Sequence, residues 1–178
     1  MEQQLVVEPS LSLEPLAVHP NALLIKSLYS AIGAQDLTAI DACYDDEAYF
    51  QDIAFRRHRK RRIMEMWRYV CHGKPDVTFD VNTISADDRT GTGRWRAKYV
   101  FGKTDRKPGV RIDNAITSAF VFRNGLIVEH RDDCDVMGWA RQAFRSPIAV
   151  FIVGHVAPFR RGMAGLKLYR FRKKQKTD

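Results

Sequence analysis

Hydrophobic positions follow a helical period in the first part of the chain and a strand period further on. The first stripe recurs at the i, i+4, i+7 and i+8 spacing of one helix face and predicts a helix over residues 21–32. Gly33 is expected to end this helix, because glycine adopts the left-handed C-terminal conformation without steric cost. The stripe consists of Leu24, Leu28, Ala31 and Ile32.

Two more helices and a short strand are expected before the pattern changes. Asp36 is placed to cap a short second helix. Residues 48–52 are a strand candidate, and a third helix is predicted over residues 63–71, where Gly73 follows and stops it. The apolar stripe of the third helix consists of Ile63, Met66, Trp67, Val70 and Cys71.

Apolar residues then alternate with polar ones in four runs, which predicts strands of a sheet. Asn124 and Gly125 separate the last two runs and are a strong signal for a hairpin turn. A short closing helix over residues 136–145 is expected to follow. The alternating runs cover residues 77–81, 94–101, 116–122 and 126–132.

The grouping of helices ahead of strands predicts an α+β fold, with the helices packed on one face of a mainly antiparallel sheet. A length of 178 residues suits one domain with a sizeable core. We expect a flexible N-terminal arm over residues 1–20, a domain over residues 21–146, and an apolar and then basic tail over residues 147–178.

The net charge of +8 is concentrated at one end of the chain. Eight basic residues and one acid lie between residues 160 and 178, a net +7 that leaves +1 for the other 159 residues. No apolar run has transmembrane length, and no secretory pattern opens the chain. The three widely spaced cysteines predict reduced thiols in a cytoplasmic protein. No nucleotide fingerprint or clustered metal ligands are visible, so neither a cofactor nor a metal is expected.

Two stretches resemble one family. Residues 28–55, LYSAIGAQDLTAIDACYDDEAYFQDIAF, are similar to the opening of ketosteroid isomerases and SnoaL-like proteins, where two helices lead into a strand that ends in Asp. Residues 120–135, FVFRNGLIVEHRDDCD, resemble the last hairpin of the same nuclear-transport-factor-2-like superfamily, including its limonene-epoxide-hydrolase-like members. With the helix around Met66 and Trp67, the resemblance covers residues 21–144.

This resemblance implies a cone, in which a strongly curved mixed sheet wraps around the three N-terminal helices and encloses a pocket. It also implies a homodimer formed through the outer face of the sheet. Members of the family include isomerases, dehydratases, cyclases, epoxide hydrolases and non-catalytic proteins, so the fold alone leaves the function open.

The resemblance also assigns individual positions. Tyr29 stands where the isomerases have an oxyanion-binding tyrosine, and Asp52 stands where they have the proton-shuttling base. Ser118 occupies the position of their second acid and still offers a hydroxyl donor. Asp132 matches the aspartate that activates water in the epoxide-hydrolase-like members.

Strand geometry gives part of the same site without the resemblance. If Leu126 and Val128 point inward, His130 and Asp132 lie on the same inward face. A carboxylate beside an imidazole can orient the ring and leave its other nitrogen to move a proton. The side chains expected to line the pocket and contact the substrate are Trp67, Trp95, Tyr99, Ser118, Phe120 and Phe122.

Each candidate residue also has an ordinary structural interpretation. Asp52 could cap the helix that follows it, and Tyr29 could be a half-buried core tyrosine. His130 could be a core histidine bonded to the backbone, and Asp132 could be equally structural. Asp135 is expected to cap the closing helix rather than to take part in chemistry.

Two basic segments suggest further functions. Residues 56–62, RRHRKRR, are expected to form a solvated face that leads into the third helix, and the alternative is a site for nucleic acid or another polyanion. In the tail, Leu166, Leu168, Tyr169 and Phe171 are interleaved with basic residues. This composition suits an anionic membrane surface or a phosphate backbone, and the alternative is a segment packed on the domain with a solvated basic end.

Three functions follow as hypotheses. The first is a cofactor-free enzyme of the isomerase, dehydratase or hydrolase kind, in which Asp132 and His130 transfer protons and Asp52 and Tyr29 assist. Its substrate would be a small apolar molecule. The second is a non-catalytic protein that binds an apolar ligand. The third is a scaffold whose basic tail contacts an anionic membrane or nucleic acid.

Overall fold

A computed structural model describes residues 18–55, 57–104 and 108–175, so the expected arm over residues 1–20 lies almost wholly outside the described part. The described residues form six α-helices, one 3-10 helix and a seven-stranded sheet. The helices are α1 (Pro20–Ala34), α2 (Leu37–Ala42), α3 (Lys60–His72), η1 (Val81–Thr83), α4 (Val136–Ala143), α5 (Pro147–His155) and α6 (Ala157–Lys174). The strands are β1 (Tyr44–Gln51), β2 (His58–Arg59), β3 (Asp76–Phe79), β4 (Ser85–Ala86), β5 (Thr90–Phe101), β6 (Val110–Arg123) and β7 (Leu126–Cys134).

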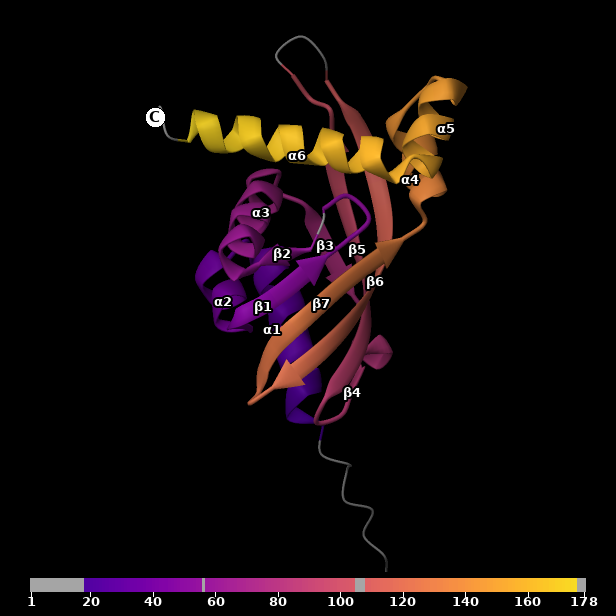
Figure 1. Cartoon of the computed structure of the whole chain (residues 1–178). Helices are drawn as coiled ribbons and strands as arrows, with labels where there is room; N and C mark the ends of the chain where they lie inside the picture. Colours follow the sequence, from indigo (N-terminus) through magenta and orange to yellow (C-terminus); the bar gives the residue numbers. More distant parts are fainter. Residues whose placement is uncertain (1–17, 56, 105–107, 176–178) are drawn as a thin grey trace, which may run out of the picture.

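The sheet has the order β2-β1-β7-β6-β5-β3, and β4 pairs with β5. Only the β1–β7 pair is parallel among the described strands, so the sheet is mixed and mainly antiparallel, as predicted. Figure 1 shows the long strands β5, β6 and β7 curving past α1, with α2 and α3 on the same side of the sheet. The α+β cone predicted from the sequence is therefore confirmed.

Helix α1 fills the inside of the cone with a buried face that includes Ile25, Leu28, Tyr29 and Ile32. It continues past Gly33, contrary to expectation. The left-handed residue that ends it is Gln35, with φ of 61°, and its backbone N–H reaches the carbonyl oxygens of Ala31 and Ile32.

Both predicted aspartate caps are present. Asp36 Oδ1 accepts hydrogen bonds from the backbone nitrogens of Thr38 and Ala39, each at 3.0 Å. Asp135 Oδ1 accepts one from the nitrogen of Gly138 at 2.9 Å and so starts α4. Such caps satisfy N–H groups that have no partner inside the helix.

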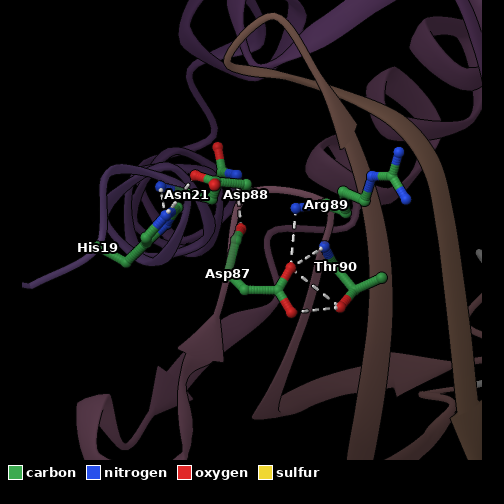
Figure 2. A network of polar contacts seen from close by, with 6 residues as sticks. All are labelled: His19, Asn21, Asp87, Asp88, Arg89 and Thr90. Atoms are coloured by element: carbon green, nitrogen blue, oxygen red, sulfur yellow. Dashed lines mark hydrogen bonds and ion pairs between the residues drawn. The ribbon is translucent and has the colours of Figure 1, made fainter.

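A polar network fastens the start of α1 to the turn before β5 (Figure 2). Asn21 Nδ2 donates to the carbonyl oxygen of Asp87 at 2.8 Å, and His19 Nε2 lies 3.1 Å from Asp88 Oδ1. Asp87 Oδ1 in turn accepts from the nitrogens of Arg89 and Thr90. The network fixes the start of α1, which lies at the end of the molecule opposite to α6 (Figure 1).

The predicted strands differ from the observed ones at their ends. β1 begins four residues earlier than expected, at Tyr44, and Asp52 follows its last residue. The run over residues 77–81 is a strand only as far as Phe79, because Asp80 caps the 3-10 helix η1. The hairpin turn at Asn124 and Gly125 is present, with φ of 54° and 73°.

The described part of residues 147–178 forms two helices, α5 and α6. Helix α6 crosses the end of the cone above α3 (Figure 1), and Leu168 belongs to the hydrophobic core. Phe171 packs against Tyr69 of α3, with ring centroids 5.4 Å apart. Arg160 is buried and donates to the carbonyl oxygens of Ile53 and Val153, both at 2.8 Å.

Candidate functional site

Strand β7 turns His130 and Asp132 into the cone, although not for the reason expected. Leu126 and Val128 are only half-buried, whereas Ile127 is fully buried. The register against β6 shifts between Ile127 and Glu129, which is the mark of a β-bulge at Val128. The bulge reverses the alternation, so that His130 and Asp132 face inward with 2% and 8% of their surface exposed.

A first chain of hydrogen bonds leads from α3 through β1 to Asp132. Trp67 Nε1 donates to the hydroxyl oxygen of Tyr44 at 3.2 Å. The Tyr44 hydroxyl lies 2.7 Å from His130 Nδ1, and His130 Nε2 lies 2.8 Å from Asp132 Oδ1. Three different elements therefore hold the imidazole of His130 between a hydroxyl and a carboxylate.

A second chain reaches the same oxygen from β5 and β6. Trp95 Nε1 donates to Ser118 Oγ at 3.1 Å, and Ser118 Oγ donates to Asp132 Oδ1 at 2.5 Å. Ser118 lies directly opposite Asp132 in the β6–β7 pairing and is fully buried. Both chains end on Oδ1, and Oδ2 of Asp132 accepts no hydrogen bond from the residues that the structure describes.

The number of hydrogens that each group can donate fixes the direction of both hydrogen-bond chains. Trp67 can only donate, so the Tyr44 oxygen is its acceptor and the Tyr44 hydrogen points to His130 Nδ1. The imidazole then carries its hydrogen on Nε2 and donates it to Asp132. Every hydrogen is used once in this arrangement, and a carboxylate is the terminal acceptor that it requires.

Tyr29 stands beside this network without joining it. Its ring lies 5.9 Å from that of Trp95 and 6.3 Å from that of Phe120. Its hydroxyl oxygen is buried and has no hydrogen-bond partner among the described residues. Burial raises the pKa of this hydroxyl well above its ordinary value, an effect that the nearby Ser118 partly offsets. Tyr29 therefore keeps its proton and offers an unused donor.

Asp52 approaches the site from the end of β1. Its Oδ1 accepts hydrogen bonds from the backbone nitrogens of Ala54, at 2.7 Å, and Phe55, so it caps its own loop. The pKa of this carboxyl is raised to about 7, chiefly by burial and also by the charge of Asp132, while those backbone bonds and the charge of Arg160 partly oppose the rise. The side chain makes no direct hydrogen bond to His130 or Asp132.

Two of the expected wall residues lie away from Asp132. Tyr99 is only half-buried and accepts a hydrogen bond from Trp139 Nε1 at 2.8 Å, and burial raises its pKa to about 12. Phe122 stacks on the far side of Phe120, with ring centroids 6.1 Å apart. The side chains that surround the network are Tyr29, Phe50, Trp67, Trp95 and Phe120.

These rings pack against one another. Of two hollows among the described residues, the larger borders the network at Trp95 and the smaller is lined by other residues. The larger, of about 640 Å³, lies mostly on the outer face of the sheet, where Arg94, Arg96, Thr117 and Asp133 line it, and Trp95 and Cys134 also line it. The other, of about 260 Å³, lies between α3 and α6. No group of three His, Cys, Asp or Glu in the described ranges could hold a metal ion.

The sequence analysis missed Tyr44 and Arg160. Tyr44 was not predicted to lie in a strand, because the three acidic residues that follow it look like a turn. In the structure these residues form an irregular stretch of β1. Arg160 was counted with the solvated charges of the tail. Only the fold shows that it is buried, since its partners include Ile53, which is distant in sequence.

The basic segment over residues 56–62 is a charged surface, as expected, in its described part. Arg57 and Arg59 lie over the ring of Tyr49, and Arg57 also pairs with Glu129 at 3.1 Å. Lys60 donates to the carbonyl oxygen of Tyr44 at 2.8 Å. These cations have partners within the domain.

A mixed sheet wrapped around helices, with polar side chains inside, defines the class of nuclear-transport-factor-2-like cone proteins. The sequence profile of the SnoaL-like domain matches residues 25–130, and the chain belongs to this family. No match was found among curated protein sequences.

Solved structures agree with the family. An LEH-like epoxide hydrolase from M. tuberculosis is 19% identical, with a TM-score of 0.57 over 75% of this chain and 96% of that one. IdmH from Streptomyces antibioticus, a proposed polyketide cyclase, is 17% identical, with a TM-score of 0.59 over 70% and 98%. A proposed SnoaL-like polyketide cyclase from Jannaschia sp. CCS1 is 12% identical, with a TM-score of 0.61 over 75% and 98%. At these identities the likeness shows the fold.

Proposed function

We propose that this protein is a cofactor-free enzyme that acts on a small, largely apolar molecule by acid–base chemistry. The observation that carries the proposal is the convergence of two donor chains on one oxygen of Asp132, inside a ring-lined interior. A buried carboxyl group is costly without partners, and two aligned donor chains supply this one with hydrogen bonds. The second oxygen of Asp132 is left to accept a proton.

In this proposal Asp132 is the base and His130 is the residue that positions it. The ring is held by Tyr44 on one side and donates to Oδ1 on the other, so Oδ2 keeps a fixed direction. A proton taken from a substrate carbon, or from a water that attacks the substrate, would pass to Oδ2.

Asp52 suits the opposite role of acid. A carboxyl whose pKa is raised to about 7 is partly protonated near neutral pH and can release a proton. Tyr29 would donate its unused hydroxyl hydrogen to an oxygen on which negative charge develops.

Epoxide hydrolysis is the first reaction to test. It needs a base for the attacking water and an acid for the leaving oxygen, which Asp132 and Asp52 would supply. The similarity to an LEH-like epoxide hydrolase supports the same choice. Isomerisation or cyclisation needs the same proton transfers and is supported by the similarity to the two proposed cyclases.

The test compares Asp132→Asn with Asp133→Asn. The two aspartates are adjacent, but Asp133 points to the outer face and is exposed. Hydrolysis of a cyclic terpene epoxide and isomerisation of a 3-oxo-Δ5 steroid would be followed with each variant. We expect Asp132→Asn to lose at least about 100-fold in kcat/KM, and Asp133→Asn to keep the wild-type value. Equal rates for both variants would show that Asp132 is structural. Ligand-induced thermal stabilisation without turnover would favour a binding protein.

We further propose a homodimer formed through the outer sheet face. The hollow of about 640 Å³ on this face would receive side chains of the second copy. Light scattering is expected to give a dimer for the wild type and a monomer for Thr117→Arg, because Thr117 lines this hollow. A wild-type monomer at about 100 μM, well above the Kd of a stable dimer, would contradict this.

A further inference from the structure

Helix α6 has two apolar faces, of which the fold uses one. The inner face carries Arg160, Ala164 and Leu168 at four-residue spacing, and it packs on the domain. The outer face carries Phe159, Leu166 and Tyr169, which fall within about one quarter of the helix circumference at 100° per residue. Gly162 and the exposed Lys173 fall in the same quarter.

The outer face is unusually exposed for such side chains. Phe159, Leu166 and Tyr169 expose 49%, 49% and 61% of their surface. On the neighbouring α5, Ile148 and Phe151 expose 72% and 61%. Both helices lie at the same end of the molecule, opposite to the start of α1 (Figure 1). Exposed apolar side chains gathered in this way mark an interaction surface.

The charge of the C-terminal stretch indicates which partner fits this surface. No Asp or Glu occurs between residues 136 and 177, whereas that stretch contains ten Lys and Arg residues. Arg170 and Lys174 are exposed beside the apolar stripe of α6. A helix that combines an outward apolar stripe with flanking cations fits the boundary between lipid head groups and acyl chains of an anionic bilayer.

We propose that α5 and α6 bind an anionic membrane surface, with the outer face of α6 lying in the plane of the interface. Phe159, Leu166 and Tyr169 would enter the apolar boundary, while Arg170 and Lys174 contact lipid phosphates. No helix in the described part of the chain is long and apolar enough to cross a membrane, so the contact is peripheral.

Other occupants fit less well. A second copy of the chain would bring an equally basic surface against this one, and like charges oppose that contact. A nucleic acid would pair with the cations but would leave Phe159 and Leu166 in water. The buried face of α6 is already occupied by the domain, since Arg160 bonds to Ile53 and Val153.

Vesicle flotation of the full chain tests the proposal independently of any enzymatic activity. The probes are vesicles of phosphatidylcholine alone and of phosphatidylcholine with about 30% phosphatidylglycerol, a fraction that gives a negative surface potential. We expect binding to the anionic vesicles only, weakened by salt. No binding to anionic vesicles at low salt would overturn the proposal.

Matched variants separate the apolar contribution to vesicle binding from the electrostatic one. Leu166→Ser is compared with Leu23→Ser, because both leucines lie on helices and expose 49% of their surface. We expect Leu166→Ser to weaken binding about tenfold, and Leu23→Ser to leave it unchanged. Arg170→Gln is compared with Arg89→Gln, an exposed arginine just before β5, and we expect about fivefold weaker binding for the first alone.

Two results point to the other occupants and also overturn the proposal. Duplex DNA that displaces the vesicles, with Leu166→Ser binding DNA as the wild type does, would assign the surface to nucleic acid. A change of oligomeric state in Leu166→Ser by light scattering, with vesicle binding unaltered, would assign it to a second copy.

Discussion

The hydroxyl of Tyr44 lies 2.7 Å from Nδ1 of His130 and links the first long strand of the fold to the last. β1 and β7 are parallel neighbours, and this side-chain contact adds to their backbone pairing. Because Trp67 of α3 donates to the same hydroxyl, the contact also fixes a helix against the sheet. The orientation of His130, and through it that of Asp132, therefore depends on an interaction between residues 86 positions apart.

Replacing Tyr44 by Phe removes this link without changing the shape of the side chain. It leaves His130 Nδ1 and Trp67 Nε1 buried without a partner. We expect a loss of about 1–3 kcal/mol in the free energy of unfolding, measured with urea. The control is Tyr49→Phe on the same strand, whose ring contacts Arg57 and Arg59, and which we expect to change stability by less than about 0.5 kcal/mol. Equal stabilities of the two variants would show that the buried network is not formed in solution.

Asp52 is expected to make stability fall as the pH rises. Its pKa is raised from 3.8 to about 7 in the fold, so between these values the folded chain binds the proton more tightly than the unfolded chain. The contribution is fully present below about pH 4 and is lost as the pH rises through 7. Because the side chain keeps some exposure, we expect a loss of about 1–3 kcal/mol rather than the full amount that the shift implies.

Urea unfolding at about pH 5 and pH 8 measures this effect in three proteins. Asp52→Asn keeps the backbone bonds to Ala54 and Phe55 but cannot ionise, so its pH dependence over this range should be flatter than that of the wild type. Asp133→Asn should follow the wild type. Parallel pH profiles for Asp52→Asn and the wild type would mean that Asp52 has an ordinary pKa.

Arg160→Ala is expected to loosen the C-terminal helices. The guanidinium group donates to three backbone carbonyls, those of Ile53, Val153 and Gly154, and the substitution leaves them without this partner. We expect a loss of about 2–4 kcal/mol and faster tryptic cleavage within α6. Arg170→Ala, on the exposed face of the same helix, is the control and should leave both readouts near wild type. Slow cleavage in both variants would show that α6 is held by other contacts.

Gly93 and Gly165 should respond to alanine in opposite directions. A Cβ atom at Gly93 would lie 2.7 Å from the Tyr29 hydroxyl, and this ring is confined by Trp95 and Phe120. We expect Gly93→Ala to cost about 1–3 kcal/mol. At Gly165, on α6, a Cβ would meet nothing within 4 Å, and alanine is the better helix former, so Gly165→Ala should add about 0.5–1 kcal/mol. Thermal unfolding of both variants measures whether each substitution stabilises or destabilises the fold.

The sequence predicted the order of elements because each follows from local periodicity and capping. Asp36 and Asp135 cap helices through bonds to residues two or three positions away, so their roles are visible in a short window. The register of β7 was harder to predict from the sequence. Alternation placed Leu126 and Val128 inward, and only pairing with β6 produces the bulge that turns Ile127, His130 and Asp132 inward.

The site shows the same division between local and long-range information. The proximity of His130 and Asp132 follows from their spacing on one strand. Ser118 and Tyr44 reach them through strand pairings, and the burial of Arg160 depends on a helix that packs from the far end of the chain. Such contacts are determined by the packing of the whole domain, which no window of the sequence contains.

Nitrogen NMR of the His130 ring tests the central claim most directly, because the convergence of both donor chains on Asp132 requires one particular tautomer. We predict a hydrogen on Nε2 and none on Nδ1, as the hydrogen bonds of the ring require, with the signals assigned by comparison with His130→Gln. The same spectrum of Tyr44→Phe should show that this preference for Nε2 weakens, because Nδ1 loses its donor. A ring with its hydrogen on Nδ1, or with hydrogens on both nitrogens, would contradict the proposed network and the role of Asp132 as its acceptor.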